Sequence, residues 1–359
     1  HTGRGNYGHG LDTMWLNLPE VEVAAVADAD ARGLGLAMQK LKPRKGFADY
    51  RQMLAETQPD IVAIGPRHVD QHRDMVLASI EAGAKGLYME KPFVRTLSEA
   101  DEVVAACEQR QVKLAVAHRN RYHPAVPVVA QLVNEGAIGR LLEFRARGKE
   151  DTRGGALDAW VLGSHLFNLM HFFGGLPLAC SAVVLQNGKL ATKADVKAGD
   201  EGLSPLAGNE VHGRFEMACG VPGFFDSVQG AGVKTAGFGL QLIGTEGVID
   251  LRIDAEPIAH LLQGSPFGPT STPRSWTPIS SAGVGQPEPL ADIKSLVGGH
   301  LAPARDLFAA MRENRQPLCG PVEARVTVEM ISALFESHRV QGARVPLPLK
   351  RRTNPIESW

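Results

Sequence analysis

The stretch Gly3-Arg4-Gly5-Asn6-Tyr7-Gly8 matches the pattern G-x-G-x-x-G. A helix-like spacing of apolar residues follows at Leu11, Met14, Trp15 and Leu18, and then an apolar run, Val21–Ala27, that ends at Asp28. Glycines let the backbone approach a pyrophosphate, and the start of a helix offers N–H donors and a positive dipole end. The order predicts a dinucleotide-binding turn, although a chain with 39 glycines also yields this pattern as a plain flexible turn.

After this turn, short apolar runs alternate with helical patterns through residue 120. Strands are expected at Val21–Ala27, Ile61–Pro66, Gly86–Glu90 and Lys113–Ala117, and helices at Ala31–Leu41, Asp49–Glu56, Asp70–Ala82 and Ser98–Arg110, the last capped by Ser98 with Asp101. Strands that are apolar on both faces and alternate with helices typically form a parallel sheet that helices cover on both sides. We therefore predict an α/β fold, with a doubly wound Rossmann domain at residues 1–120 whose first strand is missing.

Residues 121–359 show a different pattern, which predicts an α+β domain with a large open, mainly antiparallel sheet. A helix is expected at Ala125–Glu135, and strands at Leu141–Arg147, Cys180–Gln186, His212–Ala218, Gly237–Ile243 and Val248–Ile253. A surface loop or lid is expected at Gly264–Gly285, and closing helices at Leu301–Glu313 and Val322–Val340 that pack back on the first domain. Helices on one face would leave an apolar sheet face exposed, which favours a homodimer or homotetramer.

Composition excludes several classes of protein. The 38 basic and 39 acidic residues nearly cancel, which argues against a nucleic-acid partner, and no apolar run approaches a membrane span. The four cysteines are scattered, and no Cys/His/Asp cluster has metal-ligand spacing, so we expect no metal. Such cysteines fit a reducing, cytoplasmic location, with an export signal before His1 left open.

Asp28 ends the predicted second strand and is the candidate partner of an adenosine ribose. Its charge would repel a 2′-phosphate, so NAD is favoured over NADP, while nearby Arg32, Arg44 and Lys45 leave NADP as an alternative. Asp28 could instead cap the helix that starts at Ala31. Because the register of the glycine turn is open, the candidate phosphate contacts are Thr2, Gly3, Arg4, Gly5, Asn6 and Tyr7.

Three further segments carry a resemblance. They are Pro66-Arg67-His68-Val69-Asp70-Gln71-His72, Glu90-Lys91-Pro92 and Gly163-Ser164-His165-Leu166-Phe167-Asn168-Leu169-Met170. With the tail Val345–Leu349, the chain resembles the glucose–fructose oxidoreductase/inositol dehydrogenase (Gfo/Idh/MocA) family over its full length. The resemblance implies NAD(P) as cofactor and a sugar, cyclitol or polyol as substrate. It also implies cofactor contacts at Pro66, Arg67, His72, Glu90 and Lys91.

Lys91 and His165 are the candidate catalytic residues. A histidine is a suitable base for the proton of an alcohol, and an ammonium group can stabilise the developing negative charge on its oxygen. The alternatives are an exposed loop lysine and a core or helix-capping histidine. The family often has an acid four residues before this histidine, where this chain has Val161. The relay is thus incomplete, and Asp158 is the candidate substitute.

Other polar residues are candidate substrate contacts. Asn168 stands where the family often has a second acid or amide, and Arg119, Asn120 and Tyr122 follow the predicted strand at Lys113–Ala117, where they could also form a plain linker cap. Trp160 could stack on a sugar face or pack in the core. Glu150, Asp151, Arg153 and Asp158 could bind sugar hydroxyls.

Three functions fit this sequence. The first is an NAD(P)-dependent dehydrogenase acting on CH–OH groups. The second is a glycoside-processing enzyme that retains NAD, transiently oxidises C3 and eliminates the aglycone, for which the missing acid at Val161 leaves room. The third is a non-catalytic nucleotide-sensing protein, which is less favoured because both candidate catalytic side chains are present.

Overall fold

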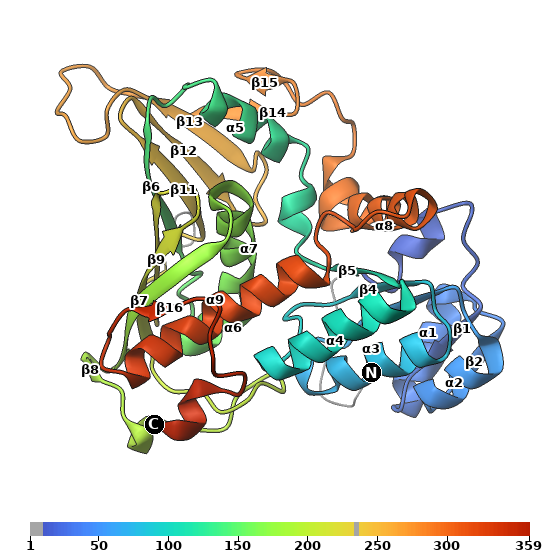
Figure 1. Ribbon diagram of the computed structural model, residues 1–359. Helices are drawn as coiled ribbons and strands as arrows, with labels where there is room; N and C mark the ends of the chain where they lie inside the picture. The colour runs from blue at the N-terminus through green and yellow to red at the C-terminus, as the bar shows by residue number, and fades with distance from the viewer. Residues whose placement is uncertain (1–9, 233–236) are drawn as a thin grey trace. The chain divides into compact units, whose positions relative to one another are not determined.

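The computed structural model describes residues 10–232 and 237–359, which fall into two compact units (Figure 1). The first unit comprises His1–Arg119, Glu201–Leu203 and Asp292–Arg325, and the second comprises Asn120–Asp200, Ser204–Ala291 and Val326–Trp359. The glycine-rich turn at residues 3–8 lies outside the described residues. Each unit is built around its own sheet system.

Parallel strands and helices alternate in the first unit, as the sequence predicts. β1 (Ala25–Ala27) pairs with β2 (Lys45–Phe47), and β4 (Gly86–Met89) lies between β3 (Ile61–Ile64) and β5 (Lys113–Val116). The helices are α1 (Ala31–Leu41), α2 (Tyr50–Thr57), α3 (His72–Glu81), α4 (Leu97–Arg110) and α8 (Leu301–Glu313). Figure 1 shows α8 on one side of β4 and β5, and α3 and α4 on the other. The doubly wound α/β arrangement is confirmed.

A cavity of about 910 Å³ separates the two parallel sheets of this unit. Its walls are residues 21–29, which include β1, and residues 58–66, which include β3, with Trp15 and Phe308 among the remaining lining residues. A doubly wound sheet of the Rossmann order has a strand between these two positions. Within the described residues, no strand lies there.

Two local predictions in this unit are wrong. Residues after Gly10 form one 3₁₀ turn, Met14–Asn17, instead of a longer helix, because Pro19 follows within a few residues and cannot continue it. Leu11 and Met14 are nevertheless fully buried in the core. Helix α4 is capped by Thr96, whose hydroxyl accepts a hydrogen bond from the backbone N–H of Glu99, and not by Ser98.

The second unit contains the large, mainly antiparallel sheet. Its strands are β6 (Leu141–Arg147), β7 (Pro177–Gln186), β8 (Lys189–Leu190), β9 (Glu210–Met217), β10 (Pro222–Val228), β11 (Gly239–Gly244), β12 (Gly247–Arg252), β13 (Ala259–Gln263), β14 (Thr277–Ser280), β15 (Gly283–Val284) and β16 (Val345–Pro346). The sequence analysis missed β10, which pairs in parallel with β6 at the centre of the sheet. The helices are α5 (Ala125–Asn134), α6 (Ala156–Val161), α7 (Gly163–Gly174) and α9 (Pro321–Arg339), which continues from the first unit.

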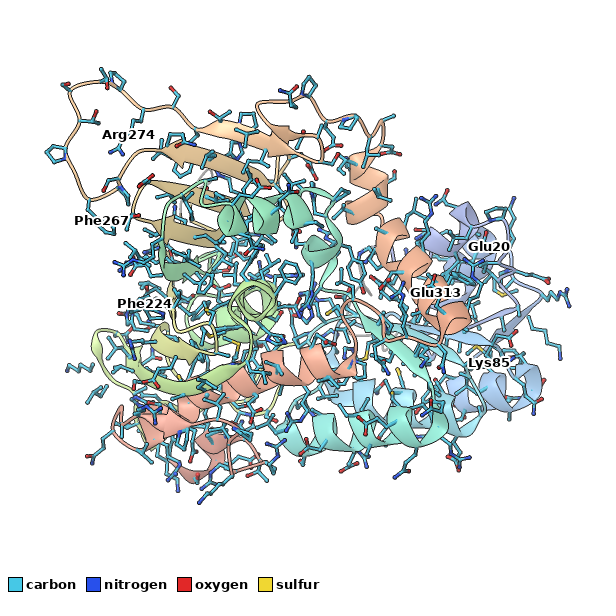
Figure 2. The ribbon with its side chains drawn as sticks, turned by 45° about the horizontal axis from the view of Figure 1, so that its top comes forward. Glu20, Lys85, Phe224, Phe267, Arg274 and Glu313 are labelled. Atoms are coloured by element: carbon cyan, nitrogen blue, oxygen red, sulfur yellow. The ribbon has the colours of Figure 1, made fainter. Side chains whose placement is uncertain are left out.

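The predicted loop at Gly264–Gly285 is only partly a loop. Residues 264–276 connect β13 to β14 without regular structure, and Figure 2 shows Phe267 and Arg274 on this connection. The remainder forms the small hairpin of β14 and β15, in which Ile279 pairs with Val284. Phe267 is 66% exposed.

The two faces of the large sheet differ in polarity. Phe225 of β10 faces α7, where its ring centroid lies 4.6 Å from that of Phe167. Phe224 points to the opposite face, where it is paired in register with Arg145 and Arg214 (Figure 2). That face carries ion pairs such as Arg145–Glu143 and Arg344–Glu216. Our expectation of an apolar exposed face is therefore wrong.

Candidate active site

The first candidate group lies at the carboxyl end of β1. Asp28 is 3% exposed, and its Oδ1 accepts a hydrogen bond of 2.9 Å from the backbone N–H of Asp30. Asp30, rather than Asp28, caps helix α1 by accepting from Gly33 N. A Cβ added at Gly33 would lie only 2.5 Å from Asp28 Oδ2, so the carboxylate occupies the space that a side chain would fill.

Two of the three basic residues near Asp28 have acidic partners of their own. Arg44 binds Glu22 through two nitrogens, and Lys45 lies 3.3 Å from Glu56. Both ion pairs are exposed, and each neutralises a charge that could otherwise attract a 2′-phosphate. Arg44 and Lys45 are thus each engaged with an acidic side chain other than Asp28.

His72 joins the carboxyl ends of β3 and β4. The imidazole is fully buried, with Nε2 2.7 Å from the carbonyl oxygen of Pro66 and Nδ1 2.8 Å from that of Pro92. Glu90 N donates a hydrogen bond to Ile64 O, and Glu90 Oε1 accepts one from Lys91 N. These contacts fix the Glu90–Lys91 segment at the strand end, where Glu90 is 2% and Lys91 9% exposed.

Arg67 is engaged within the first unit. Its guanidinium forms an ion pair with Glu201, whose backbone oxygen also accepts a hydrogen bond from Val69 N. Arg119 similarly donates from Nη1 to the carbonyl oxygen of Gly298 at 2.9 Å. Pro66, Arg67, His72, Glu90 and Lys91 thus all lie near the ends of β3 and β4.

Helix α7 of the second unit carries His165 and Asn168. The sequence Gly163–Gly174 forms a continuous helix directly after α6, and its residues 163–170 are all buried. Asn168 Nδ2 donates to Thr327 Oγ1 of α9 at 3.4 Å, and His165 is 6% exposed. Val161 is buried at the end of α6, so the position of the missing acid is apolar in the fold as well as in the sequence.

Asp158 is a buried structural carboxylate. Its Oδ2 accepts hydrogen bonds from Ser227 Oγ at 2.6 Å and from Glu150 N at 3.0 Å. Burial raises the pKa of Asp158, and these two hydrogen bonds oppose the increase. Since Oδ2 is bound to β10 and to the loop after β6, the hypothesis that Asp158 replaces the missing acid receives no support from its contacts.

The remaining predicted contacts lie in the interior of the second unit. Asn120 exchanges two hydrogen bonds of 3.3 Å with Asp254, and Tyr122 is 8% exposed. Trp160 is 4% exposed and packs in the core, as the alternative interpretation has it. Near Asp158, Arg153 lowers the pKa of Asp151 to about 2. Among the described residues, no group of three His, Cys, Asp or Glu side chains could hold a metal ion.

Sequence reasoning missed Gly33 and Arg121. A glycine is needed at position 33 because an added Cβ would lie only 2.5 Å from Asp28 Oδ2. No sequence motif encodes this close approach. Arg121 lies inside the segment Arg119–Tyr122, which the sequence analysis singled out, yet its ring contact is with Phe172 of α7, some fifty residues further along the chain.

Within the described residues, every helix is too short or too polar to cross a bilayer.

Residues 2–118 match the family described as "Oxidoreductase family, NAD-binding Rossmann fold". Curated relatives include a D-apiose dehydrogenase of Paraburkholderia graminis, 34% identical over 125 residues, which are 35% of this chain and 33% of that protein. A levoglucosan dehydrogenase of Pseudarthrobacter phenanthrenivorans is 25% identical over 62% of this chain and 63% of its own length. The chain thus spans less than two thirds of the length of both relatives.

The structural likeness to one solved structure covers nearly the whole chain. An oxidoreductase of Agrobacterium radiobacter, crystallised with NAD⁺, L-tartaric acid and magnesium, has a TM-score of 0.70 over 94% of each chain at 18% identity. At this identity the likeness concerns the fold alone. It confirms the combination of a Rossmann sheet with a large, mainly antiparallel sheet.

We predict that Asp158→Ala lowers the free energy of unfolding by about 3 kcal/mol, because the substitution leaves the buried Ser227 hydroxyl and Glu150 N–H without an acceptor. Urea denaturation at pH 7 measures this loss. The control Asp151→Ala removes a partly exposed ion pair with Arg153 and should cost about 1 kcal/mol or less.

A third variant, Asp158→Asn, tests the protonation of Asp158. A carboxyl whose pKa is raised on folding binds more protons in the folded state, so its contribution to stability falls as the pH rises through its folded pKa. Asp158→Asn should lack this decline. Equal losses for Asp158→Ala and Asp151→Ala would contradict the structural role.

Proposed function

We propose that this chain, whose residues 2–118 match the Gfo/Idh/MocA family of NAD-binding oxidoreductases, oxidises a CH–OH group of a sugar, cyclitol or related polyol. The observation that carries the proposal is the buried lysine at the carboxyl end of β4. Ligands of doubly wound sheets bind outside the carboxyl ends of the strands, and Lys91 is held at such an end with 9% of its surface exposed. The dehydrogenases named above act on related sugars, which supports the same class of substrate.

The residues at the end of β1 fit the adenosine half of NAD. A buried carboxylate packed against Gly33 can accept hydrogen bonds from ribose hydroxyls, and its charge disfavours a 2′-phosphate. We therefore propose NAD in preference to NADP, with the six glycine-turn candidates at the phosphates. When bound, NAD would accept the hydrogen of the C–H bond together with both electrons of that bond.

A side chain of the protein must accept the proton that the alcohol releases. In the proposed reaction the alcohol loses its C–H hydrogen with two electrons and its O–H hydrogen as a proton, and the C–O bond becomes a carbonyl. His165 accepts the proton, and the Lys91 ammonium donates a hydrogen bond to the oxygen as negative charge develops. The products are the ketone or lactone, the reduced cofactor and a proton.

The buried valine before α7 defines what this histidine lacks. With Val161 in place of an acid, no carboxylate at that position orients the imidazole. We propose that Asn168, Arg119, Asn120 and Tyr122 act as substrate contacts, with Asn168 the best supported because it shares helix α7 with His165. The buried Asp158 and Trp160 would support the elements around the pocket without touching the substrate. We also propose a cytoplasmic location, since the four cysteines are free thiols, and we keep a homodimer or homotetramer as a separate proposal that size-exclusion chromatography would test.

We predict that Lys91→Met and His165→Asn each lower kcat/KM by about 100-fold or more, because each removes a group that acts on the reacting oxygen. The assay is the increase in NADH absorbance with a panel of sugars, cyclitols and polyols. The control is Lys85→Met, an exposed lysine that precedes β4 and pairs with Asp60 (Figure 2). Full activity of Lys91→Met would overturn the assignment, whereas bound NAD without accumulating NADH would favour the glycoside-processing alternative.

We predict that Gly33→Ala weakens NAD binding by about 10-fold, which corresponds to about 1.4 kcal/mol, because its Cβ displaces the Asp28 carboxylate. Gly35→Ala is the matched control in the same helix, since nothing lies within 4 Å of an added Cβ there. That control should keep its NAD affinity and gain about 0.5–1 kcal/mol of stability. Calorimetric titration with NAD measures both affinities, and equal affinities would exclude Asp28 as a cofactor contact.

A further inference from the structure

Arg121 is a buried cation without a counter-ion. It lies in the 3₁₀ turn Arg119–Tyr122 and is 9% exposed, and its Nε and Nη1 are buried with no hydrogen-bond partner. Among the described residues, no carboxylate forms an ion pair with it, and the segments 1–9 and 233–236 contain neither Asp nor Glu. The guanidinium therefore has no partner of opposite charge within this chain.

An aromatic neighbour of Arg121 lies on the face of α7 that carries His165. The guanidinium carbon of Arg121 is 5.0 Å from the centroid of the Phe172 ring. Phe172 is seven residues after His165, so two turns of helix bring both side chains to the same face, and Asn168 lies between them. Side chains on a helix lean toward its N-terminus, which brings the Phe172 ring toward Asn168.

The energetics of this arrangement are unfavourable unless a ligand completes it. Burying an unpaired ion carries a desolvation cost that a single aromatic ring offsets only in part. Arg145 provides the contrast within the same unit, since it also stacks on a phenylalanine, Phe224, at 5.3 Å. Arg145, however, is exposed and bonded to Glu143 at 2.8 Å.

We propose that Arg121 binds a carboxylate of the substrate, so that the compound oxidised is a polyhydroxy acid rather than a neutral sugar. This inference rests on the proposed function. One planar guanidinium matches one planar, singly charged carboxylate through two parallel hydrogen bonds. Neutral hydroxyls could accept the hydrogen bonds but would leave the buried charge uncompensated. The acid would lie along the His165 face of α7 with an alcohol carbon at His165.

Steady-state kinetics with matched compounds test the substrate class. D-galacturonate and D-gluconate are compared with D-galactose and D-glucitol. We expect the acids to be preferred, and Arg121→Met to lower their kcat/KM by about 10- to 100-fold, mainly through KM, because charged hydrogen bonds contribute about 1.5–3 kcal/mol. Arg121→Lys should restore part of this loss. The control Arg145→Met should leave both classes of substrate unchanged.

Thermal unfolding separates ligand binding from a structural role. Removing an uncompensated buried charge should leave the melting temperature of Arg121→Met unchanged or higher, whereas loss of a structural arginine would lower it. The acids should raise the melting temperature of the wild type and not that of Arg121→Met. Neutral sugars oxidised as well as the acids, with no selective effect of Arg121→Met, would overturn this inference and leave the dehydrogenase standing. If the acids raised the melting temperature only when Arg121 is present, but no NAD was reduced, carboxylate binding at Arg121 would stand and the proposed dehydrogenase activity would fall.

Discussion

The contacts of the buried His72 ring hold the ends of β3 and β4 together, and the candidate chemistry of the first unit depends on them. Parallel strands bring their carboxyl ends to one edge, but they do not fix the loops that follow. The imidazole lies within hydrogen-bond distance of carbonyl oxygens from both loops, Pro66 and Pro92. Glu90 and Lys91 are therefore held in buried positions at the strand end, where a flexible loop would expose them to solvent.

The second unit meets the same need with different residues. Asp158 accepts hydrogen bonds from β10 and from the loop after β6, and this network holds α6 at the point where α7 begins. His165 and Asn168 are then presented by a helix packed on the sheet through Phe167. Each unit thus supports its polar side chains with buried hydrogen bonds from regular elements. This rigidity is what a proton acceptor of defined orientation requires.

Sequence patterns predicted the parts of this fold that depend on local order. The alternation of strands and helices predicted β3, β4, β5 and α1. Those patterns could not predict that Asp158 binds Ser227, which is 69 residues away, or that Arg121 lies on Phe172. They also placed an apolar surface on the large sheet where Arg145 and Arg214 lie, because neighbouring strands determine which face each residue joins. Long-range packing, rather than propensity, decided these positions.

In the proposed reaction, the alcohol carbon transfers its hydrogen with two electrons directly to the cofactor. The direct measurement uses a polyhydroxy acid carrying deuterium on the reacting carbon, with NMR of the cofactor after one turnover. We expect deuterium at C4 of the reduced nicotinamide and a slower rate than with the unlabelled acid. Reduced cofactor without deuterium, or deuterium released only to water, would contradict it.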